Sequence, residues 1–277
     1  METLDSAPAA VEVLVLNAPD RLWDERRRMV LRKVLILAGT AEARELAALL
    51  AASPEWRTVS SFAGRTAAPK LPVGEVRTGG FGGAALLARY LREERIAAVI
   101  DASHPFAERI SRNAQAAAQT AQVPLLRLNR PPWQRQEGDR WQEIGSWAEA
   151  IPLLAGQSAR AFLAIGHQEL RAFSGLEDSF FLVRTVDPPP APLPLERYEA
   201  ITGRGPFDPE AERCLLSDHG ITHVICKNSG GGSAYGKIEA ARELGLPVII
   251  KRRPPPLRTA AVSKVEEAVK WLETVPQ

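Results

Sequence analysis

Gly39 and Thr40 stand where a nucleotide-binding turn would be expected. They follow the apolar run VLILA at 34–38 and precede a helical pattern with Glu42 in its first turn. Glycine permits a tight turn, and the amides of a following helix turn can hold a phosphate. Thr40 could cap this helix and bind an anion at once, or it could be a plain cap with Glu42 complementing the helix dipole. The other glycines of the usual dinucleotide fingerprint are absent, so this turn alone leaves the ligand open.

The residues after the second apolar run bear on the choice of cofactor. Nicotinamide enzymes place an acid here to bind a free 2′-hydroxyl, whereas an arginine accommodates a 2′-phosphate. The sequence has Gly64, Arg65 and Thr66 after this run, with no acid nearby. This pattern favours NADPH over NADH, unless Arg65 is only a solvated surface cation.

A third polar set follows the run AAVID at 97–101. Pro105 can occupy the first position of a helix, which leaves Ser103 and His104 facing a ligand crevice. A histidine there could contact a phosphate or ribose, or move a proton. The alternative is a structural, hydrogen-bonded histidine. No second histidine or cysteine lies nearby in sequence, so we expect no metal site.

The second half of the chain has a donor-rich glycine loop of its own. Lys227, Asn228, Ser229 and Gly230 follow an apolar run and precede a helical pattern. Such a loop can approach a ligand closely, and Lys227 adds a cation at a strand end. A flexible loop without function is the alternative. Arg204 lies in a similar glycine turn, where it could equally be an exposed surface residue.

The elements that must position these residues alternate along the chain. Short apolar runs alternate with helical patterns, which is typical of βαβ units and a parallel sheet. The alternation breaks over 129–145 and then resumes. We therefore predict an α/β fold with two Rossmann-like parallel-sheet domains facing each other across a cleft. The predicted parts are a leader at 1–32 that is disordered or not the native start, an N-terminal NADPH-binding domain at 33–130, and a C-terminal α/β domain at 131–277 that completes the substrate cleft.

Composition excludes several classes of function. The chain has 277 residues, 45% of them hydrophobic, and 35 Lys and Arg against 33 Asp and Glu. This balance predicts a globular protein that binds neither nucleic acid nor a membrane. The two cysteines are too few for a disulfide framework and, with four scattered histidines, lack metal-ligand spacing. This spacing predicts a protein without a metal. No apolar run approaches a membrane span of about 18 residues, so we also expect a cytoplasmic protein.

Several motifs together resemble one enzyme family. GTAEARELA, FAGRT, GGFGG, DASHPFA, GRGPF, KNSGG and the closing VIIKRRP, in this order, resemble the CobK/CbiJ family of precorrin-6A reductases over about residues 33–271. The resemblance implies a two-domain Rossmann-like enzyme that uses NADPH to reduce one double bond of precorrin-6A, giving precorrin-6B in cobalamin biosynthesis. One departure is Ala38 before Gly39, where the family usually has two glycines.

The resemblance also implies roles for particular residues. The expected cofactor contacts are Gly39, Thr40, Glu42, Ala43, Gly64, Arg65, Thr66, Gly80, Phe81, Ser103, His104, Asn228, Ser229 and Gly230. The candidate catalytic residues are His104 and Lys227. The tetrapyrrole substrate bears many carboxylates, so cations are plausible contacts, namely Arg204, Lys227, Lys251 and Arg252. Transient contact with neighbouring pathway enzymes is a further expectation.

Three alternatives stay open from the sequence. The substrate could be the cobalt-containing intermediate of the anaerobic route, which the residues alone do not distinguish. The protein could be an NADPH-binding sensor without catalysis, although a second glycine-rich loop argues against it. A methyltransferase is disfavoured by Arg65, where a ribose-binding acid would be expected.

Overall fold

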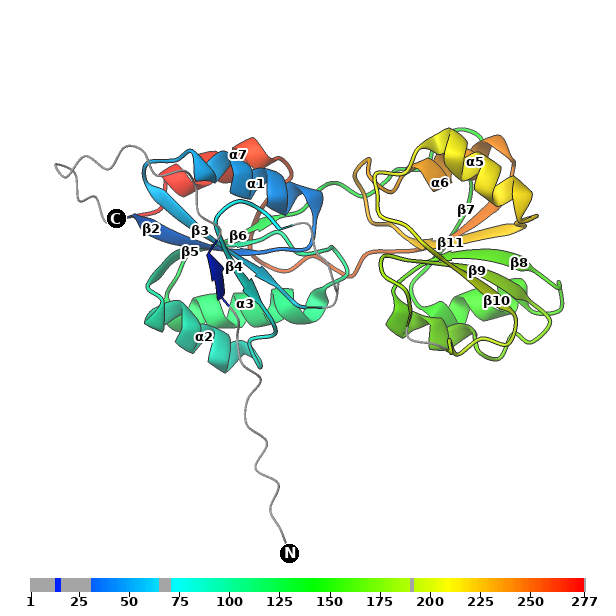
Figure 1. Ribbon diagram of the computed structural model, residues 1–277, viewed down its shortest axis with the longest axis horizontal. Coiled ribbons are helices and arrows are strands. Elements are labelled where there is room, and N and C mark those ends of the chain that lie inside the picture. Colours follow the sequence, from blue (N-terminus) through cyan, green and yellow to red (C-terminus); the bar gives the residue numbers. More distant parts are fainter. Residues whose placement is uncertain (1–12, 16–30, 65–70, 190–191, 277) are drawn as a thin grey trace, which may run out of the picture. The chain divides into compact units, whose positions relative to one another are not determined.

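The computed structural model describes residues 13–15, 31–64, 71–189 and 192–276, and the chain divides into two compact units. Unit 1 comprises Met1–Asn129 and Pro256–Gln277, and unit 2 comprises Arg130–Pro255 (Figure 1). The predicted domain boundary at the C-terminus was wrong, because residues 256–277 return to unit 1. Within the predicted leader, residues 13–15 form a strand and Arg32 begins another, while the rest of 1–30 lies outside the described residues.

The described part of unit 1 contains a seven-stranded sheet in the order β1-β4-β3-β2-β5-β6-β13. The strands are β1 (Val13–Val15), β2 (Arg32–Leu37), β3 (Trp56–Phe62), β4 (Glu75–Thr78), β5 (Ile96–Asp101), β6 (Leu125–Leu128) and β13 (Ala260–Val262). Only β1 is antiparallel to its neighbour. The six parallel strands have the Rossmann order 3-2-1-4-5-6, in which the direction of winding reverses between β2 and β5.

Helices cover both faces of this sheet. Figure 1 shows α1 (Ala41–Ala51) and α7 (Val265–Glu273) on one face, and α2 (Ala84–Glu93) and α3 (Glu108–Ala121) on the other. In α1 the buried residues Ala43, Leu46, Ala47 and Leu50 recur at helical spacing. This stripe packs with α7 over β2 and β5 in one apolar cluster, so the C-terminal helix completes the core of unit 1.

Unit 2 is a second parallel sheet. The described strands are β7 (Arg140–Ile144), β8 (Arg160–Ala164), β9 (Phe180–Thr185), β10 (Tyr198–Thr202), β11 (His223–Lys227) and β12 (Pro247–Lys251), in the order β10-β9-β8-β11-β12-β7. All pairs are parallel. Its central strands read as continuous apolar runs because both faces are buried. The predicted α/β fold with two parallel sheets is confirmed.

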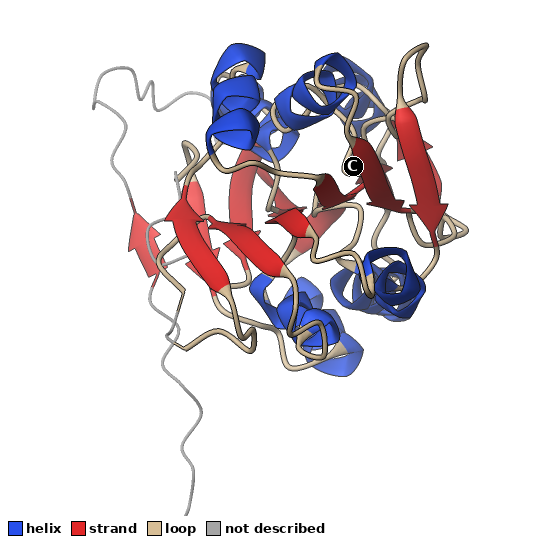
Figure 2. Cartoon of the chain, turned by 90° about the vertical axis from the view of Figure 1, so that its right-hand side faces the viewer, coloured by secondary structure: helices blue, strands red, loops and turns tan. Residues whose placement is uncertain are grey.

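Two helical layers bury the faces of the second sheet (Figure 2). One layer contains α5 (Pro209–Asp218) and α6 (Gly236–Glu243). The other contains the short helices η1 (Trp147–Ala150), α4 (Ile151–Leu154) and η2 (His167–Phe173). Within the ranges that the structure describes, none of the helices has the length and apolar character needed to cross a membrane.

Candidate functional site

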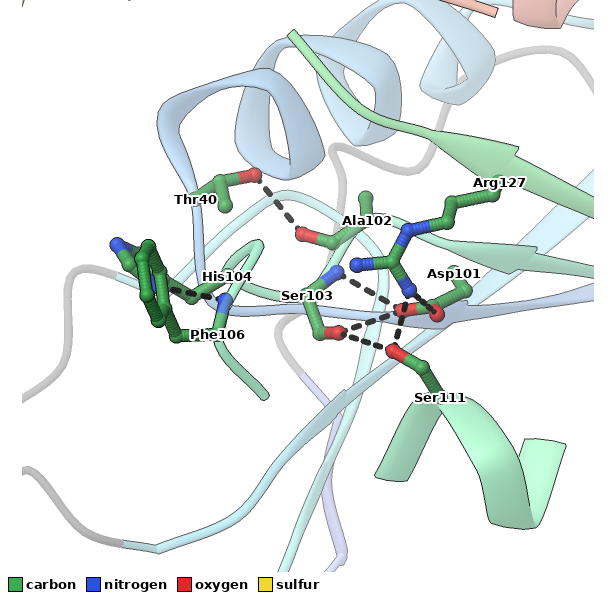
Figure 3. Close-up of polar contacts among 8 residues, drawn as sticks. All are labelled: Thr40, Asp101, Ala102, Ser103, His104, Phe106, Ser111 and Arg127. Atoms are coloured by element: carbon green, nitrogen blue, oxygen red, sulfur yellow. Dashed lines mark hydrogen bonds and ion pairs between the residues drawn. The ribbon is translucent and has the colours of Figure 1, made fainter. Parts of the chain in front are cut away.

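The first predicted site residues gather where the winding of unit 1 reverses. The Ala102 amide donates to the Leu37 carbonyl at 3.1 Å, which joins the carboxyl ends of β5 and β2. Thr40 Oγ1 donates to the Ala102 carbonyl at 2.9 Å (Figure 3) and accepts from the Ala43 amide at 3.2 Å. Thr40 is therefore the N-cap of α1, and its hydroxyl also ties α1 to the turn after β5.

Gly39 lies against this same turn. A methyl group at Gly39 would lie 3.7 Å from the backbone nitrogen of His104 and 3.9 Å from the Cα of Ser103, which are ordinary contact distances. The surrounding protein therefore does not require glycine at this position. Gly39 directly precedes the Thr40 cap, and Glu42 and Ala43 lie in the first turn of α1.

A buried ion pair holds the turn after β5. The Asp101 carboxylate accepts from Arg127 Nη1 at 2.5 Å, from Ser103 Oγ at 2.6 Å and from the Ser103 amide at 3.1 Å (Figure 3). Arg127 Nη1 also donates to the hydroxyl of Ser111 on α3. The side chains of Asp101 and Arg127 are only 2% and 11% exposed. Three elements thus fix the backbone that carries Ser103 and His104.

His104 follows this fixed turn, and its ring nitrogen Nδ1 is a hydrogen-bond acceptor. Its Nδ1 accepts from the Phe106 amide at 3.3 Å, and the two rings lie 5.8 Å apart between centroids (Figure 3). When the imidazole is neutral, this hydrogen bond places its proton on Nε2. The ring is partly exposed. His104 can therefore present an Nε2–H donor at the reversal point.

The loops after β3 and β4 lie beside each other at the same edge of the sheet. The Gly79 amide donates to the Phe62 carbonyl at 2.9 Å. A methyl group on Gly64 would meet Thr78 Cγ2 at 3.4 Å. Thr78 and Gly79 thus lie beside Gly64, and Gly80 and Phe81 follow them in the chain. Arg65 and Thr66 lie outside the described residues.

In unit 2, the winding reverses between β8 and β11, and a carboxylate lies there between two lysines. Lys227 and Lys251 are partners in register at the ends of β11 and β12. Glu169 on η2 forms an ion pair with Lys227, lies 3.9 Å from Lys251 Nζ, and accepts from Trp147 Nε1 at 2.8 Å. Burial raises the pKa of Glu169, but the bonds from Lys227 and Trp147 outweigh it and lower this pKa overall. The sequence pattern did not predict this carboxylate.

Asn228, Ser229 and Gly230 serve the structure of unit 2. The Asn228 side chain accepts from the Trp133 amide at 2.7 Å and donates to the Trp133 carbonyl at 3.0 Å. Arg253 donates to the carbonyls of Asn228 and Ser229 at 2.9 and 2.8 Å. A methyl group on Gly230, whose φ is 67°, would lie 2.1 Å from the Pro131 carbonyl oxygen. The loop needs its glycine for this close approach, a reason that lies within the protein.

The remaining cations predicted for the substrate lie near carboxylates. Arg204 Nη2 lies 3.5 Å from Asp187 Oδ1. Arg252 is exposed after β12 and contributes to lowering the pKa of Glu149, for which the main cause is the hydrogen bond from the Gly145 amide. Lys227, Lys251 and Arg252 thus share one edge of the sheet. Among the described residues, no group of three or more His, Cys, Asp or Glu side chains could hold a metal ion.

Comparison with known proteins agrees with this arrangement. The family described as precorrin-6x reductase CbiJ/CobK matches residues 33–273. A precorrin-6A reductase from Rhodococcus erythropolis is 45% identical over 244 residues, which is 88% of this chain and 98% of that protein. A cobalt-precorrin-6A reductase from Priestia megaterium is 31% identical over 247 residues, 85% of this chain and 96% of that one. The solved structure of a CobK precorrin-6A reductase superimposes with a TM-score of 0.84 at 44% identity, covering 88% of this chain and 96% of that chain. The chain therefore belongs to the precorrin-6x reductase family CbiJ/CobK.

Proposed function

We propose that this protein is an NADPH-dependent precorrin-6A reductase of cobalamin biosynthesis, which reduces one double bond of the macrocycle to give precorrin-6B. The observation that carries the proposal is the reversal point of unit 1. There the N-terminus of α1, Gly39 and the Ser103–His104 turn lie together at the carboxyl ends of β2 and β5. In sheets of this order, dinucleotides bind across that point.

The residues at this edge fit a nicotinamide dinucleotide. Gly39 directly precedes the N-cap of α1, and a helix N-terminus favours an anion such as a phosphate. The loops with Gly64 and Gly80 adjoin this turn on the side where the adenosine of a dinucleotide lies in this fold. The turn at Gly39–Thr40 lacks two glycines of the common fingerprint, and we expect it to hold a pyrophosphate through the amides of the first turn of α1.

This chain's own residues have two tasks in the proposed reaction. A reduced nicotinamide supplies the hydride when bound. His104 Nε2–H is our candidate for a hydrogen bond to the negative charge that would develop on the macrocycle, because the Asp101–Arg127 pair fixes the turn that carries it. We assign Lys227, Lys251 and Arg252 to the substrate carboxylates, since these cations share one sheet edge. Glu169 pairs with both lysines and holds them in place.

The preference for NADPH over NADH rests on Arg65. If this guanidinium meets the 2′-phosphate, Arg65→Ala should weaken NADPH binding by about 1.5–3 kcal/mol and leave NADH binding nearly unchanged. Titration calorimetry with both cofactors measures this. Arg57→Ala is the matched control, because Arg57 is exposed on the same sheet and pairs with Glu75. Equal losses for both cofactors would contradict this role of Arg65.

The metal-free substrate is favoured by the higher identity to a precorrin-6A reductase, 45% against 31% for the cobalt-precorrin-6A reductase. The test is anaerobic incubation with either substrate and NADPH, following nicotinamide absorbance. We expect faster oxidation of NADPH with precorrin-6A. Faster turnover of the cobalt form would favour the alternative substrate. Cofactor binding without turnover of either would favour a sensor.

A further inference from the structure

Arg77 is a buried cation at the cofactor edge of unit 1 that sequence analysis did not identify. It is the third residue of β4 and is 8% exposed. It lies opposite Ser61 of β3 in the strand register. Burial lowers the pKa of Arg77, so its charge is held at a cost in solvation. An arginine kept in such a place needs a structural or functional reason.

The donors of Arg77 are directed at the loop that follows its own strand. Its Nη1 donates to the Gly79 carbonyl at 2.6 Å, and its Nη2 donates to the Gly80 carbonyl at 3.1 Å. A longer bond of 3.4 Å reaches Ser61 Oγ. Within the described residues these acceptors are all neutral. The two terminal nitrogens of the guanidinium therefore donate to two successive carbonyls, a geometry that a lysine does not reproduce.

The same guanidinium supports an aromatic ring on this loop. Its carbon lies 3.8 Å from the centroid of the Phe81 ring, and Phe81 in turn makes an edge contact with Tyr90 at 5.2 Å. Arg77 thus holds the carbonyls of Gly79 and Gly80 on one side and the Phe81 ring on the other. The glycines give this segment conformational freedom, since Gly79, Gly82 and Gly83 all have positive φ. A segment of this kind needs a fixed support if it is to present one shape to a ligand.

We infer that Arg77 is a positioning residue for the adenosine end of the cofactor, acting through the loop 79–81 and not by touching the ligand itself. This inference rests on the proposed dinucleotide site. The loop lies directly beside the Phe62–Gly64 turn, where the adenosine ribose binds in this fold. Because Nη1 and Nη2 of Arg77 donate to the loop carbonyls, its effect should be the same for cofactors with and without a 2′-phosphate.

The first test measures the loop without any cofactor. Arg77→Lys keeps the charge but loses the fork, and Arg77→Met loses both. In hydrogen–deuterium exchange of the cofactor-free protein, peptides spanning 78–83 should exchange about tenfold faster or more in both variants. Peptides from unit 2 should be unchanged. Arg57→Met, at an exposed position on β3, should leave all rates as in the wild type.

The second test measures the consequence for binding. Arg77→Lys and Arg77→Met should raise the dissociation constants of NADPH and NADH alike by about tenfold, because both cofactors would have to order a loop that has lost its support. The KM for NADPH should rise by a similar factor, with kcat at saturation within about twofold of the wild type. Phe81→Leu, which removes only the supported ring, should raise both dissociation constants by a smaller factor and keeps the test valid if Arg77→Met does not fold.

The outcomes separate the two proposals. Unchanged exchange and cofactor binding in Arg77→Lys would overturn the positioning role, and so would a loss confined to NADPH, because it would mean direct contact with the 2′-phosphate. A wild-type protein that binds neither cofactor would overturn the proposed function, whereas faster exchange at 78–83 would still show the support that Arg77 gives the loop.

Discussion

At the scale of single residues, the site depends on partners that are distant in sequence. The pattern DASHP identified Ser103 and His104 as candidates from their position after an apolar run. It did not reveal that Asp101 pairs with Arg127, because the pairing needs β5 and β6 to lie side by side. The role of Ser111 was equally hidden, since its helix supplies it from the far side of the turn. Local patterns therefore indicated candidate residues for ligand contact but not the residues that hold them in place.

The buried pair makes a prediction for stability. Asp101→Asn should lower the free energy of unfolding by about 3–5 kcal/mol, because it leaves the Arg127 charge buried without its counter-charge. Urea unfolding monitored by exchange of β5 peptides measures this for unit 1. Glu108→Gln is the control, since its pair with Arg112 spans one turn of α3 and is exposed, and should cost about 0.3–0.5 kcal/mol. Losses of similar size in the two variants would contradict a structural role for the Asp101 pair.

At the scale of elements, the two glycine-containing loops proved to differ in kind. The loop after β2 keeps a glycine that its protein neighbours do not demand, whereas Gly230 after β11 is required by the Pro131 carbonyl. Both loops have the same appearance in sequence, a short polar turn between a strand and a helix. Only the packing of residues 130–133 against the second loop distinguishes them. The ligand role predicted for Asn228 through its side chain is therefore disfavoured.

Glu169 joins the elements at the reversal point of unit 2, and its lowered pKa gives a pH dependence. A carboxyl with a depressed pKa in the folded state contributes stability above its unfolded pKa, and this contribution is lost as the pH falls through the folded value. The stability advantage of the wild type over Glu169→Gln should thus be full at about pH 7 and disappear on acidification below the ordinary value of 4.5.

Urea unfolding of the two proteins over this pH range is the measurement. Glu143→Gln, at an exposed position on β7, is the control and should change the free energy of unfolding little. An advantage of the wild type that stays constant on acidification would show that the ionised Glu169 does not stabilise η2 against β11 and β12.

At the scale of the whole molecule, strand–helix alternation predicted two parallel sheets, and the apolar runs at 34–38 and 97–101 correspond to β2 and β5. The strands β4, β7 and β13 give a weaker signal in the sequence, because they are short or lie at a sheet edge and bury few apolar side chains. The alternation of strands and helices in the sequence did not predict that residues 256–277 belong to unit 1. A local pattern indicates a strand followed by a helix, but the place of this segment is decided by the pairing of β13 with β6 and by the packing of α7 against α1.

This return leads to a prediction about folding of the two units. All six described strands of the unit 2 sheet lie within 130–255, so a fragment of these residues should unfold cooperatively on its own. A fragment of residues 1–129 lacks β13 and α7, whose Val265, Ala268 and Leu272 are buried in the core of unit 1. It should therefore have a low melting temperature, and a peptide of residues 256–277 should bind it and raise that temperature in a concentration-dependent way.

Circular dichroism melting curves at several peptide concentrations measure the effect. The control peptide carries Leu272→Asp, which would bury an unpaired charge at a position 1% exposed in the folded chain and should not stabilise the fragment. A fragment of 1–129 that melts at the same temperature with and without the native peptide would show that the first five parallel strands form a complete folding unit. The segment 256–277 would then be an addition to unit 1 that its core does not require.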